Sequence, residues 1–122
     1  MADTISATPK ITRGTTPEIT CKVSKDLTGY TCELSIGKGA KKPYFTASND
    51  QMTVTHSVED GQQVTTLVFK LTQQQTLACK AGDAMVQLRI ILGSDAKSSD
   101  MAPITILDII RDGEITDEYD AD

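Results

Sequence analysis

The sequence predicts an all-β protein, an antiparallel β-sandwich of about seven short strands with one short helical turn near residues 72–78. Apolar residues recur at every second position in several segments, which is the pattern of strands with one buried face. Turn-forming residues separate these segments at short intervals, as in sandwiches rather than in folds built from long helices. A chain of 122 residues with 39% hydrophobic residues has room for one core of this kind.

Two segments in the first third of the chain show this alternation. In residues 18–24 the apolar positions alternate with polar ones, residues 25–29 supply a turn, and a second alternating run follows over 30–36. The side chains expected to face the core are those of Ile19, Cys21, Val23, Tyr30, Cys32, Leu34 and Ile36. We expect the two runs to pair as neighbouring strands.

The segment from Gly37 to Lys42 is rich in glycine and lysine. A phosphate-binding loop of the Walker type requires four residues between its glycines, followed by Lys-Ser or Lys-Thr, and this spacing is missing here. We interpret the segment as a solvated turn that leads into a short edge strand around residues 43–45. Lysine and proline at such a position protect a sheet edge from unwanted pairing.

Residues 51–71 are expected to form a β-hairpin. Asp60-Gly61 lies between two alternating runs, and this dipeptide favours a type I′ turn because both central positions adopt positive φ. The turn fixes the register. The expected cross-strand pairs are Glu59–Gln62, His56–Thr65, Thr55–Thr66, Val54–Leu67 and Met52–Phe69. The large apolar side chains then meet on one face, which His56 shares as a partly buried residue.

The next segment leaves the alternating pattern. Thr72 with Gln75 three residues later is the pattern of a capping box, so one helical turn is expected here. At a sandwich corner, such a turn carries the chain from one sheet to the other. Alternation predicts a central strand over 86–92 and a last strand over 104–106, with a polar connection over 93–103 between them.

Cysteine and histidine limit the chemistry that the chain can carry. The three cysteines, Cys21, Cys32 and Cys79, are expected to be reduced and buried. The spacing of Cys21 and Cys79 is similar to that of the intersheet disulfide of immunoglobulin domains. However, Trp is absent and Leu77 stands where those domains have a tyrosine.

No catalytic or metal-binding pattern stands out. Zinc sites need paired Cys and His at short spacing, and this chain has one histidine and no close cysteine pair. A Cys–His dyad that forms only in the fold stays open. We expect no enzymatic activity, no cofactor and no metal.

Composition argues against several classes of partner. The chain has 12 basic and 17 acidic residues, a net charge of −5, whereas nucleic-acid binding needs clustered Lys and Arg. No apolar run approaches the ~20 residues that span a bilayer, and the first residues lack the apolar stretch of a signal peptide. We therefore expect no nucleic-acid partner, no membrane insertion and no signal-directed secretion.

The two ends of the chain differ from its centre. Residues 1–16 are mostly small and polar, and we expect a flexible N-terminal arm there. Residues 112–122 hold six of the seventeen acidic residues but lack the spacing of an EF-hand calcium loop, so we expect an acidic C-terminal tail. The sandwich domain is expected over residues 17–111.

Four short segments occur in an order that resembles a known family. They are Arg13-Gly14-Thr15-Thr16-Pro17, Leu71-Thr72-Gln73-Gln74-Gln75-Thr76, Val86-Gln87-Leu88-Arg89 and Arg111-Asp112-Gly113-Glu114-Ile115. On these segments the chain resembles small proteins encoded among the tail and baseplate genes of phages and prophages of Gram-positive bacteria. Those proteins look like the immunoglobulin-like N-terminal domain of baseplate upper proteins. The resemblance covers roughly residues 11–115, implies an immunoglobulin-like sandwich, and brings no catalytic residues with it.

The resemblance implies a non-enzymatic structural or assembly protein of a tail or baseplate. Its partners would be other tail or baseplate proteins, with a homo-oligomer as a further alternative, and it would be made in the bacterial cytoplasm before entering the virion. The expected assembly interface comprises Ile11, Thr12 and Arg13, which could add to a neighbour's sheet, and Arg111, Asp112 and Gly113, which could dock a partner. The alternative is a module that binds a host-surface glycan or protein through loops 37–43 and 93–103.

Overall fold

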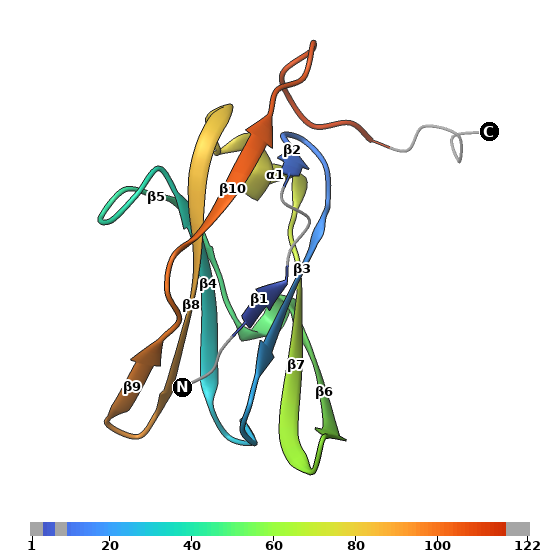
Figure 1. The fold of residues 1–122 in the computed structure, drawn as a ribbon. Coiled ribbons are helices and arrows are strands. Elements are labelled where there is room, and N and C mark those ends of the chain that lie inside the picture. The colour runs from blue at the N-terminus through green and yellow to red at the C-terminus, as the bar shows by residue number, and fades with distance from the viewer. Residues whose placement is uncertain (1–3, 7–9, 117–122) are drawn as a thin grey trace, which may run out of the picture.

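The protein folds into two β-sheets packed face to face (Figure 1). The computed structural model describes residues 4–6 and 10–116. The first sheet has the order β1-β3-β7-β6, formed by β1 (Thr4–Ser6), β3 (Glu18–Val23), β7 (Gln62–Lys70) and β6 (Met52–Glu59). The second has the order β2-β10-β8-β4-β5, formed by β2 (Lys10–Thr12), β10 (Ala102–Leu107), β8 (Gly82–Leu92), β4 (Thr31–Gly37) and β5 (Pro43–Ala47). Strand β9 (Asp95–Ser98) pairs with the end of β8.

The strand order confirms the immunoglobulin-like β-sandwich. The first sheet follows the order A, B, E, D of immunoglobulin domains, and β10-β8-β4-β5 follows G, F, C, C′. Every strand pair is antiparallel except β2 with β10, which is parallel. The described residues form ten strands rather than about seven, because β1, β2 and β9 are short strands in segments that the sequence predicted to be an arm or a loop.

One predicted pairing is wrong. Strands β3 and β4 were expected to be neighbours, but β3 pairs with β1 and β7 while β4 pairs with β5 and β8 in the other sheet. Alternation identifies the buried face of a strand and not the sheet to which it belongs. The connection between them is attached to β7, because Thr65 Oγ1 donates to the Lys25 carbonyl at 2.7 Å and accepts from the Leu27 amide at 3.2 Å.

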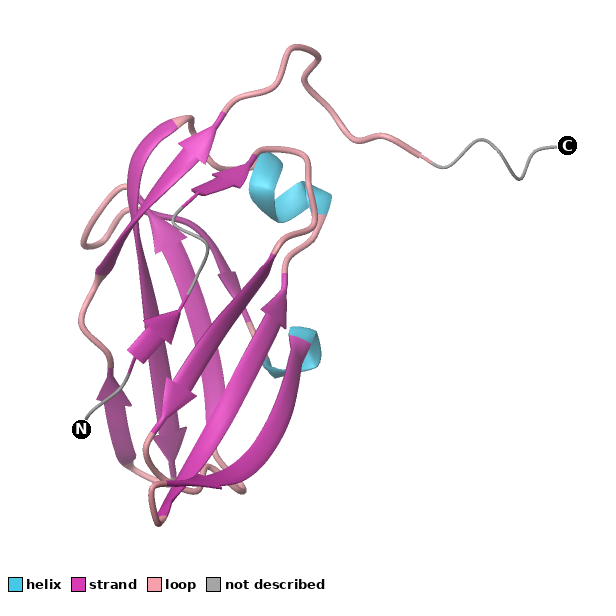
Figure 2. Cartoon of the chain, turned by 45° about the vertical axis from the view of Figure 1, so that its right-hand side comes forward, coloured by secondary structure: helices cyan, strands magenta, loops and turns pink. Residues whose placement is uncertain are grey.

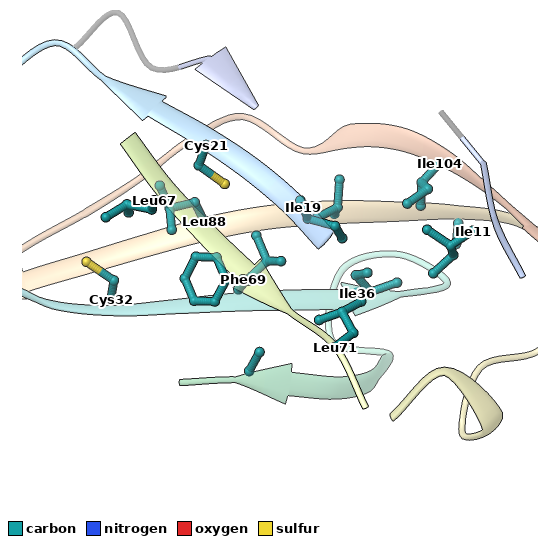
Figure 3. Close-up of a cluster of buried hydrophobic side chains, with 14 of the residues drawn as sticks. Ile11, Ile19, Cys21, Cys32, Ile36, Leu67, Phe69, Leu71, Leu88 and Ile104 are labelled. Atoms are coloured by element: carbon teal, nitrogen blue, oxygen red, sulfur yellow. The ribbon is translucent and has the colours of Figure 1, made fainter. Parts of the chain in front are cut away.

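The core lies between the inner faces of the two sheets (Figure 3). Its largest fully buried side chains include Phe69 and Leu67 of β7, Ile19 of β3, and Leu34 and Ile36 of β4. The cysteines Cys21, Cys32 and Cys79 are all buried and free, as the sequence predicted. Burial of the predicted inward-facing residues of β3 and β4 is thus confirmed, with Tyr30 half-buried at the margin of the core.

The hairpin of β6 and β7 has the predicted register at all five pairs. Asp60 and Gly61 adopt φ of 52° and 77°, as a type I′ turn requires. The burial of β6 differs from expectation, because Val54 is 41% exposed and the His56 side chain is 53% exposed. Strand β6 is the edge of its sheet, so its inward-pointing side chains meet the core on one side only.

The short helix α1 (Gln73–Leu77) carries the chain from β7 in the first sheet to β8 in the second (Figure 2). The predicted capping box is present: Thr72 Oγ1 accepts from the Gln75 amide, and the Gln75 side chain accepts from the Thr72 amide, both at 3.1 Å. A single 3₁₀ turn, η1 (Asn49–Gln51), joins β5 to β6. The expected edge strand around 43–45 is β5, which lies at the edge of the second sheet.

The segments predicted as an N-terminal arm and a polar loop contain ordered strands. Within residues 1–16, Lys10–Thr12 form β2 and Ile11 is 4% exposed, so the flexible arm is wrong for this part of the segment. One apolar residue between polar ones gave too little alternation to reveal a strand. Residues 95–98 form β9, which has no buried residue and hence no hydrophobic pattern.

Candidate assembly interface

The residues predicted as an assembly interface lie together at one end of the sandwich. Strand β2 pairs with the end of β10, which places Ile11 opposite Ile106 and Thr12 opposite Leu107. Arg13 follows directly, and the segment with Arg111, Asp112 and Gly113 follows β10. The structure joins the two groups through one ion pair, in which Arg13 Nη2 lies 3.0 Å from Asp112 Oδ1.

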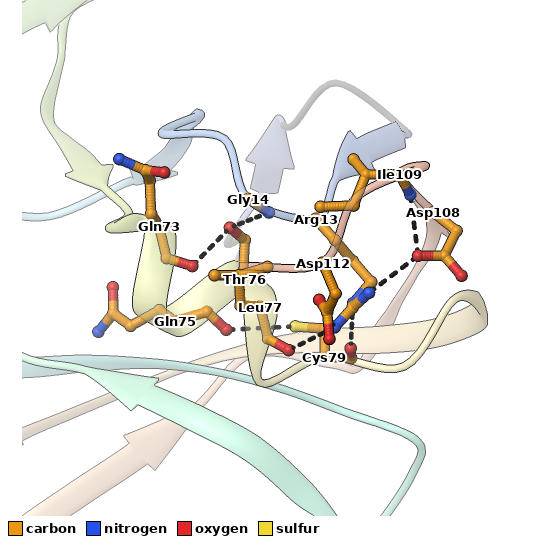
Figure 4. A network of polar contacts seen from close by, with 10 residues as sticks. All are labelled: Arg13, Gly14, Gln73, Gln75, Thr76, Leu77, Cys79, Asp108, Ile109 and Asp112. Carbon is orange, nitrogen blue, oxygen red and sulfur yellow. Dashed lines mark hydrogen bonds and ion pairs between the residues drawn. The ribbon is translucent and has the colours of Figure 1, made fainter. Parts of the chain in front are cut away.

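The Arg13 side chain is the centre of a polar network (Figure 4). Its guanidinium donates to the carbonyls of Leu77 at 2.9 Å and Cys79 at 2.8 Å, which lie at and just beyond the end of α1. It also donates to Asp108 at 2.8 Å and to Asp112 at 3.0 Å. The last carbonyls of a helix lack partners within the helix, and a cation satisfies them both by hydrogen bonding and by charge.

The carboxylates of this network respond to the cation beside them. The hydrogen bond from Arg13 lowers the pKa of Asp108, and the hydrogen bond to Asp108 raises the pKa of Arg13. Both groups therefore keep their charges across the neutral range.

A buried threonine links the same turn to α1. Thr76 is fully buried, and its hydroxyl accepts from the Gly14 amide at 3.0 Å and donates to the Thr15 carbonyl at 2.9 Å. Farther along, the Gln73 side-chain amide pairs with the backbone of Ile115 in both directions, at 3.0 and 2.8 Å. Helix α1 thus contacts both the turn that follows β2 and the segment that follows β10.

These contacts change the interpretation of the predicted interface residues. Ile11 and Thr12 already occupy their own sheet, and Arg13 directs its hydrogen bonds to groups of the same chain. The three resemblance segments 13–17, 71–76 and 111–115 meet around α1, whereas 86–89 lies within β8. Their polar groups stabilise the end of the fold, and β2 lies at the edge of the second sheet, where no described strand pairs with its outer side.

Strand β6 is a longer free sheet edge, which the sequence analysis missed. No strand described by the structure pairs with its outer side. The turn makes Glu59 and Gln62 a hydrogen-bonded pair, and alternation along the ladder then directs the backbone N–H groups of Val54, His56 and Val58 outward. The signal was present in the sequence, because Met52–Glu59 contains neither Lys nor Pro, whereas β5 begins with Pro43 directly after two lysines.

A groove lies beside this edge, on the open side of the sandwich. It has a volume of about 390 Å³ and runs between β6 and the connection that leads into β4. Its walls include Val54, His56 and Met52 on one side and Leu27 and Tyr30 on the other. The Lys25 ammonium donates to Tyr30 Oη at 2.8 Å, which fixes the ring at the rim of the groove. The wall combines apolar side chains with polar groups, among them Thr28, Asn49 and His56, which can give direction to an occupant.

The described part of the chain contains neither a metal-binding cluster nor a membrane-spanning helix. In residues 4–6 and 10–116, no three His, Cys, Asp or Glu side chains lie close enough to hold a metal ion. None of the helices in these residues has the length and apolar character needed to span a bilayer.

No protein-family model matches the sequence, and no curated protein matches it either.

Proposed function

We propose that the chain is a non-enzymatic assembly protein of a phage or prophage tail or baseplate, and that it acts by accepting a strand from a partner protein along β6. The observation that carries the assembly role is the eight-residue edge β6, whose side chains beyond Met52 are all exposed. The tail and baseplate setting rests on the resemblance of the segments around α1 and in β8.

Strand addition uses the outward backbone groups of β6 and the groove beside it. The outward backbone groups at Val54, His56 and Val58 pair with the incoming strand, and such main-chain hydrogen bonds supply affinity without requiring a particular sequence. Alternate side chains of the incoming strand then point into the groove of about 390 Å³ beside β6. Val54, Met52 and Tyr30 in this groove favour a partner strand that places apolar side chains against them.

The test compares two substitutions at one residue. Val54→Pro removes an outward-pointing N–H, which an edge strand tolerates because that group has no partner within the sheet. Val54→Thr is the matched control, since it keeps the N–H and the β-branched shape. Circular dichroism should show the same fold and similar Tm for both variants.

The readout is incorporation into particles. Mass spectrometry of particles purified from an induced host should detect the wild-type chain and the Val54→Thr variant, and not the Val54→Pro variant. Equal incorporation of all three would exclude strand addition at β6. Absence of the wild-type chain from particles, together with no binding to purified tail proteins, would exclude the assembly role itself.

One observation favours the alternative, a module that binds a host-surface glycan or protein. Loops 37–43 and 93–103 approach one another, because Lys41, Pro43 and Met101 line the same cavity of about 200 Å³. Tyr44 packs partly against the core, so it offers less of a stacking face to a sugar than a free aromatic ring would. Binding on a glycan array that is lost on Met101→Asp would favour this function over assembly.

A further inference from the structure

Ile110 is fully exposed on a short loop at the end of the sandwich. Ile110 has a relative exposure of 107%, the highest among the exposed large hydrophobic residues of the described chain. It lies in the segment after β10 that projects beyond the sheets (Figure 1). An exposed apolar side chain of this size is ordinary on a surface when it stands alone, so its setting decides whether it has a role.

The setting is a loop whose two ends are held by one side chain. Arg13 donates to Asp108 at 2.8 Å and to Asp112 at 3.0 Å, on either side of Ile110. Between them Ile109 turns inward and lies half-buried against the turn at Gly14, which leaves Ile110 directed outward. The loop is therefore ordered before any partner arrives, and preordering of a contact residue reduces the entropy lost on binding.

The same chain carries a cavity that complements this loop. The cavity, on the outer face of the second sheet beside the β4–β5 turn, has a volume of about 200 Å³. Pro43, Met85 and Met101 line it as apolar groups, and Lys41 and Arg89 are the cationic groups in its lining. Cavities of about 150 Å³ accommodate benzene, so an isoleucine side chain fits this volume.

The two surfaces carry net charges of opposite sign. Residues 108–116 hold three acidic side chains, Asp108, Asp112 and Glu114, and one basic side chain, Arg111, so the loop stays net negative although Arg13 pairs with both aspartates. Asp108 and Asp112 flank Ile110, and their side chains are 61% and 75% exposed despite the ion pairs with Arg13. The β4–β5 turn carries three exposed cationic side chains, Lys38, Lys41 and Lys42. Complementary charges at the rim of a contact favour encounter and fix orientation.

We propose that the loop of Ile110 docks into the cavity lined by Lys41, Met85 and Met101 on a second copy of this chain. The two surfaces lie on different parts of the molecule, so the contact is head-to-tail: each copy uses its loop on one neighbour and its cavity on another. A contact of this type forms a ring when the rotation closes and an open filament when it does not. This self-association adds to the proposed assembly role and uses neither β6 nor the groove beside it.

The first measurement is sedimentation velocity of the wild-type chain over a wide range of concentration. We expect the weight-average mass to rise from the 13.1 kDa of one chain to values beyond two chains. Ile110→Ser and Lys41→Glu should each weaken association, Ile110→Ser by about ten- to a hundredfold because its apolar side chain is lost from the contact. Leu92→Ser, which removes an exposed apolar side chain that belongs to neither the loop nor the cavity, should leave association unchanged.

The second measurement mixes the two weakened variants. Ile110→Ser retains an intact cavity and Lys41→Glu retains an intact loop, so an equimolar mixture can form one productive contact. We expect this mixture to form particles of two chains and nothing larger, whereas the wild-type chain grows beyond two.

A wild-type chain that stays a monomer at high concentration would overturn the proposal, as would an Ile110→Ser variant that associates like wild type. A mixture that associates no better than its separate components would also overturn it. None of these results bears on strand addition, because the incorporation test with Val54→Pro and Val54→Thr reports on β6 separately.

Discussion

The Arg13 guanidinium donates a hydrogen bond of 2.8 Å to Asp108, although 95 positions in the sequence separate the two residues. The same guanidinium reaches the carbonyls of Leu77 and Cys79. One side chain thus connects strand β2, helix α1 and the segment after β10, which are the three parts of the chain that meet at this end of the sandwich.

Replacing Arg13 with lysine should loosen this end of the fold. Lysine keeps the positive charge but cannot reach four acceptors, because its ammonium is a single point and not a planar fork. We expect Arg13→Lys to lower Tm by about 5 °C, and hydrogen exchange to speed up over residues 108–115. Arg89→Lys is the matched control, since Arg89 makes one exposed ion pair with Glu33 at 3.4 Å. Equal Tm values for the two variants would contradict the assigned role.

Acid should weaken the same contact. The Arg13 hydrogen bond lowers the pKa of Asp108 below the ordinary 3.8, so the folded state binds this proton less tightly than the unfolded state. The stability that this pair supplies is present above pH 3.8 and is lost as the pH falls through the folded-state pKa. Asp108→Asn should therefore flatten part of the acid limb in a plot of urea midpoint against pH. An acid limb identical to that of wild type would count against the ion pair.

Thr76 offers a test of a buried hydroxyl. Thr76→Val keeps the shape of the side chain but leaves the Gly14 amide and the Thr15 carbonyl without their partner. An unsatisfied buried polar group costs about 1–3 kcal/mol, so we expect the free energy of unfolding to drop by that amount. Thr53→Val on exposed β6 makes the same chemical change without a buried partner and should be nearly neutral. Urea denaturation of both variants gives the comparison.

Local patterns predicted the parts of this fold that depend on neighbouring residues. The register of the β6–β7 hairpin followed from Asp60-Gly61, because the turn type alone aligns the two strands. The capping box at Thr72 was equally local. The expected pairing of β3 with β4 failed because the choice of sheet depends on β7 and β8, which lie far along the chain.

The candidate site also combines features that the sequence could predict with features that it could not. The sequence singled out Arg13 and Asp112, but no spacing rule relates residues 99 positions apart, and their ion pair within one chain could not be foreseen. The open edge β6 could have been inferred from its lack of Lys and Pro. Its exposure could not, because the apolar positions of Val54 and Val58 indicated a buried face.

Alanine substitutions at Gly61 and Gly37 should lower the stability of the fold by different amounts and for different reasons. Gly61 has a φ of +77°, and a Cβ added there would meet no atom within 4 Å, so Gly61→Ala introduces backbone strain only, about 1 kcal/mol. At Gly37, a Cβ would overlap the Lys42 carbonyl oxygen and Pro43 Cα across the β4–β5 bulge. Backbone atoms cannot move aside as a flexible side chain would, and we expect Gly37→Ala to cost about 3 kcal/mol. Thermal unfolding should give a lower Tm for Gly37→Ala than for Gly61→Ala. A smaller loss of stability for Gly37→Ala would contradict this prediction.

The three cysteines should be inert in the folded protein and should weaken it in alkali. Burial raises the pKa of Cys21 to about 12 and that of Cys79 to about 11, and it also raises the pKa of Cys32. Since the thiolate is the reactive form, a thiol reagent at pH 8 should react with all three cysteines only after urea unfolds the chain.

The sign of the pH effect follows from the same shifts. The folded state holds these protons more tightly than the unfolded state, whose thiols have a pKa near 9.0. The stabilising contribution is complete below that value and is lost as the pH rises toward 11 and 12. Urea midpoints between pH 8 and pH 10.5 should decline less steeply for Cys79→Ala than for wild type. Rapid modification of one cysteine in the native protein would show instead that its thiolate is accessible, and it would restore nucleophilic catalysis as a function to be tested.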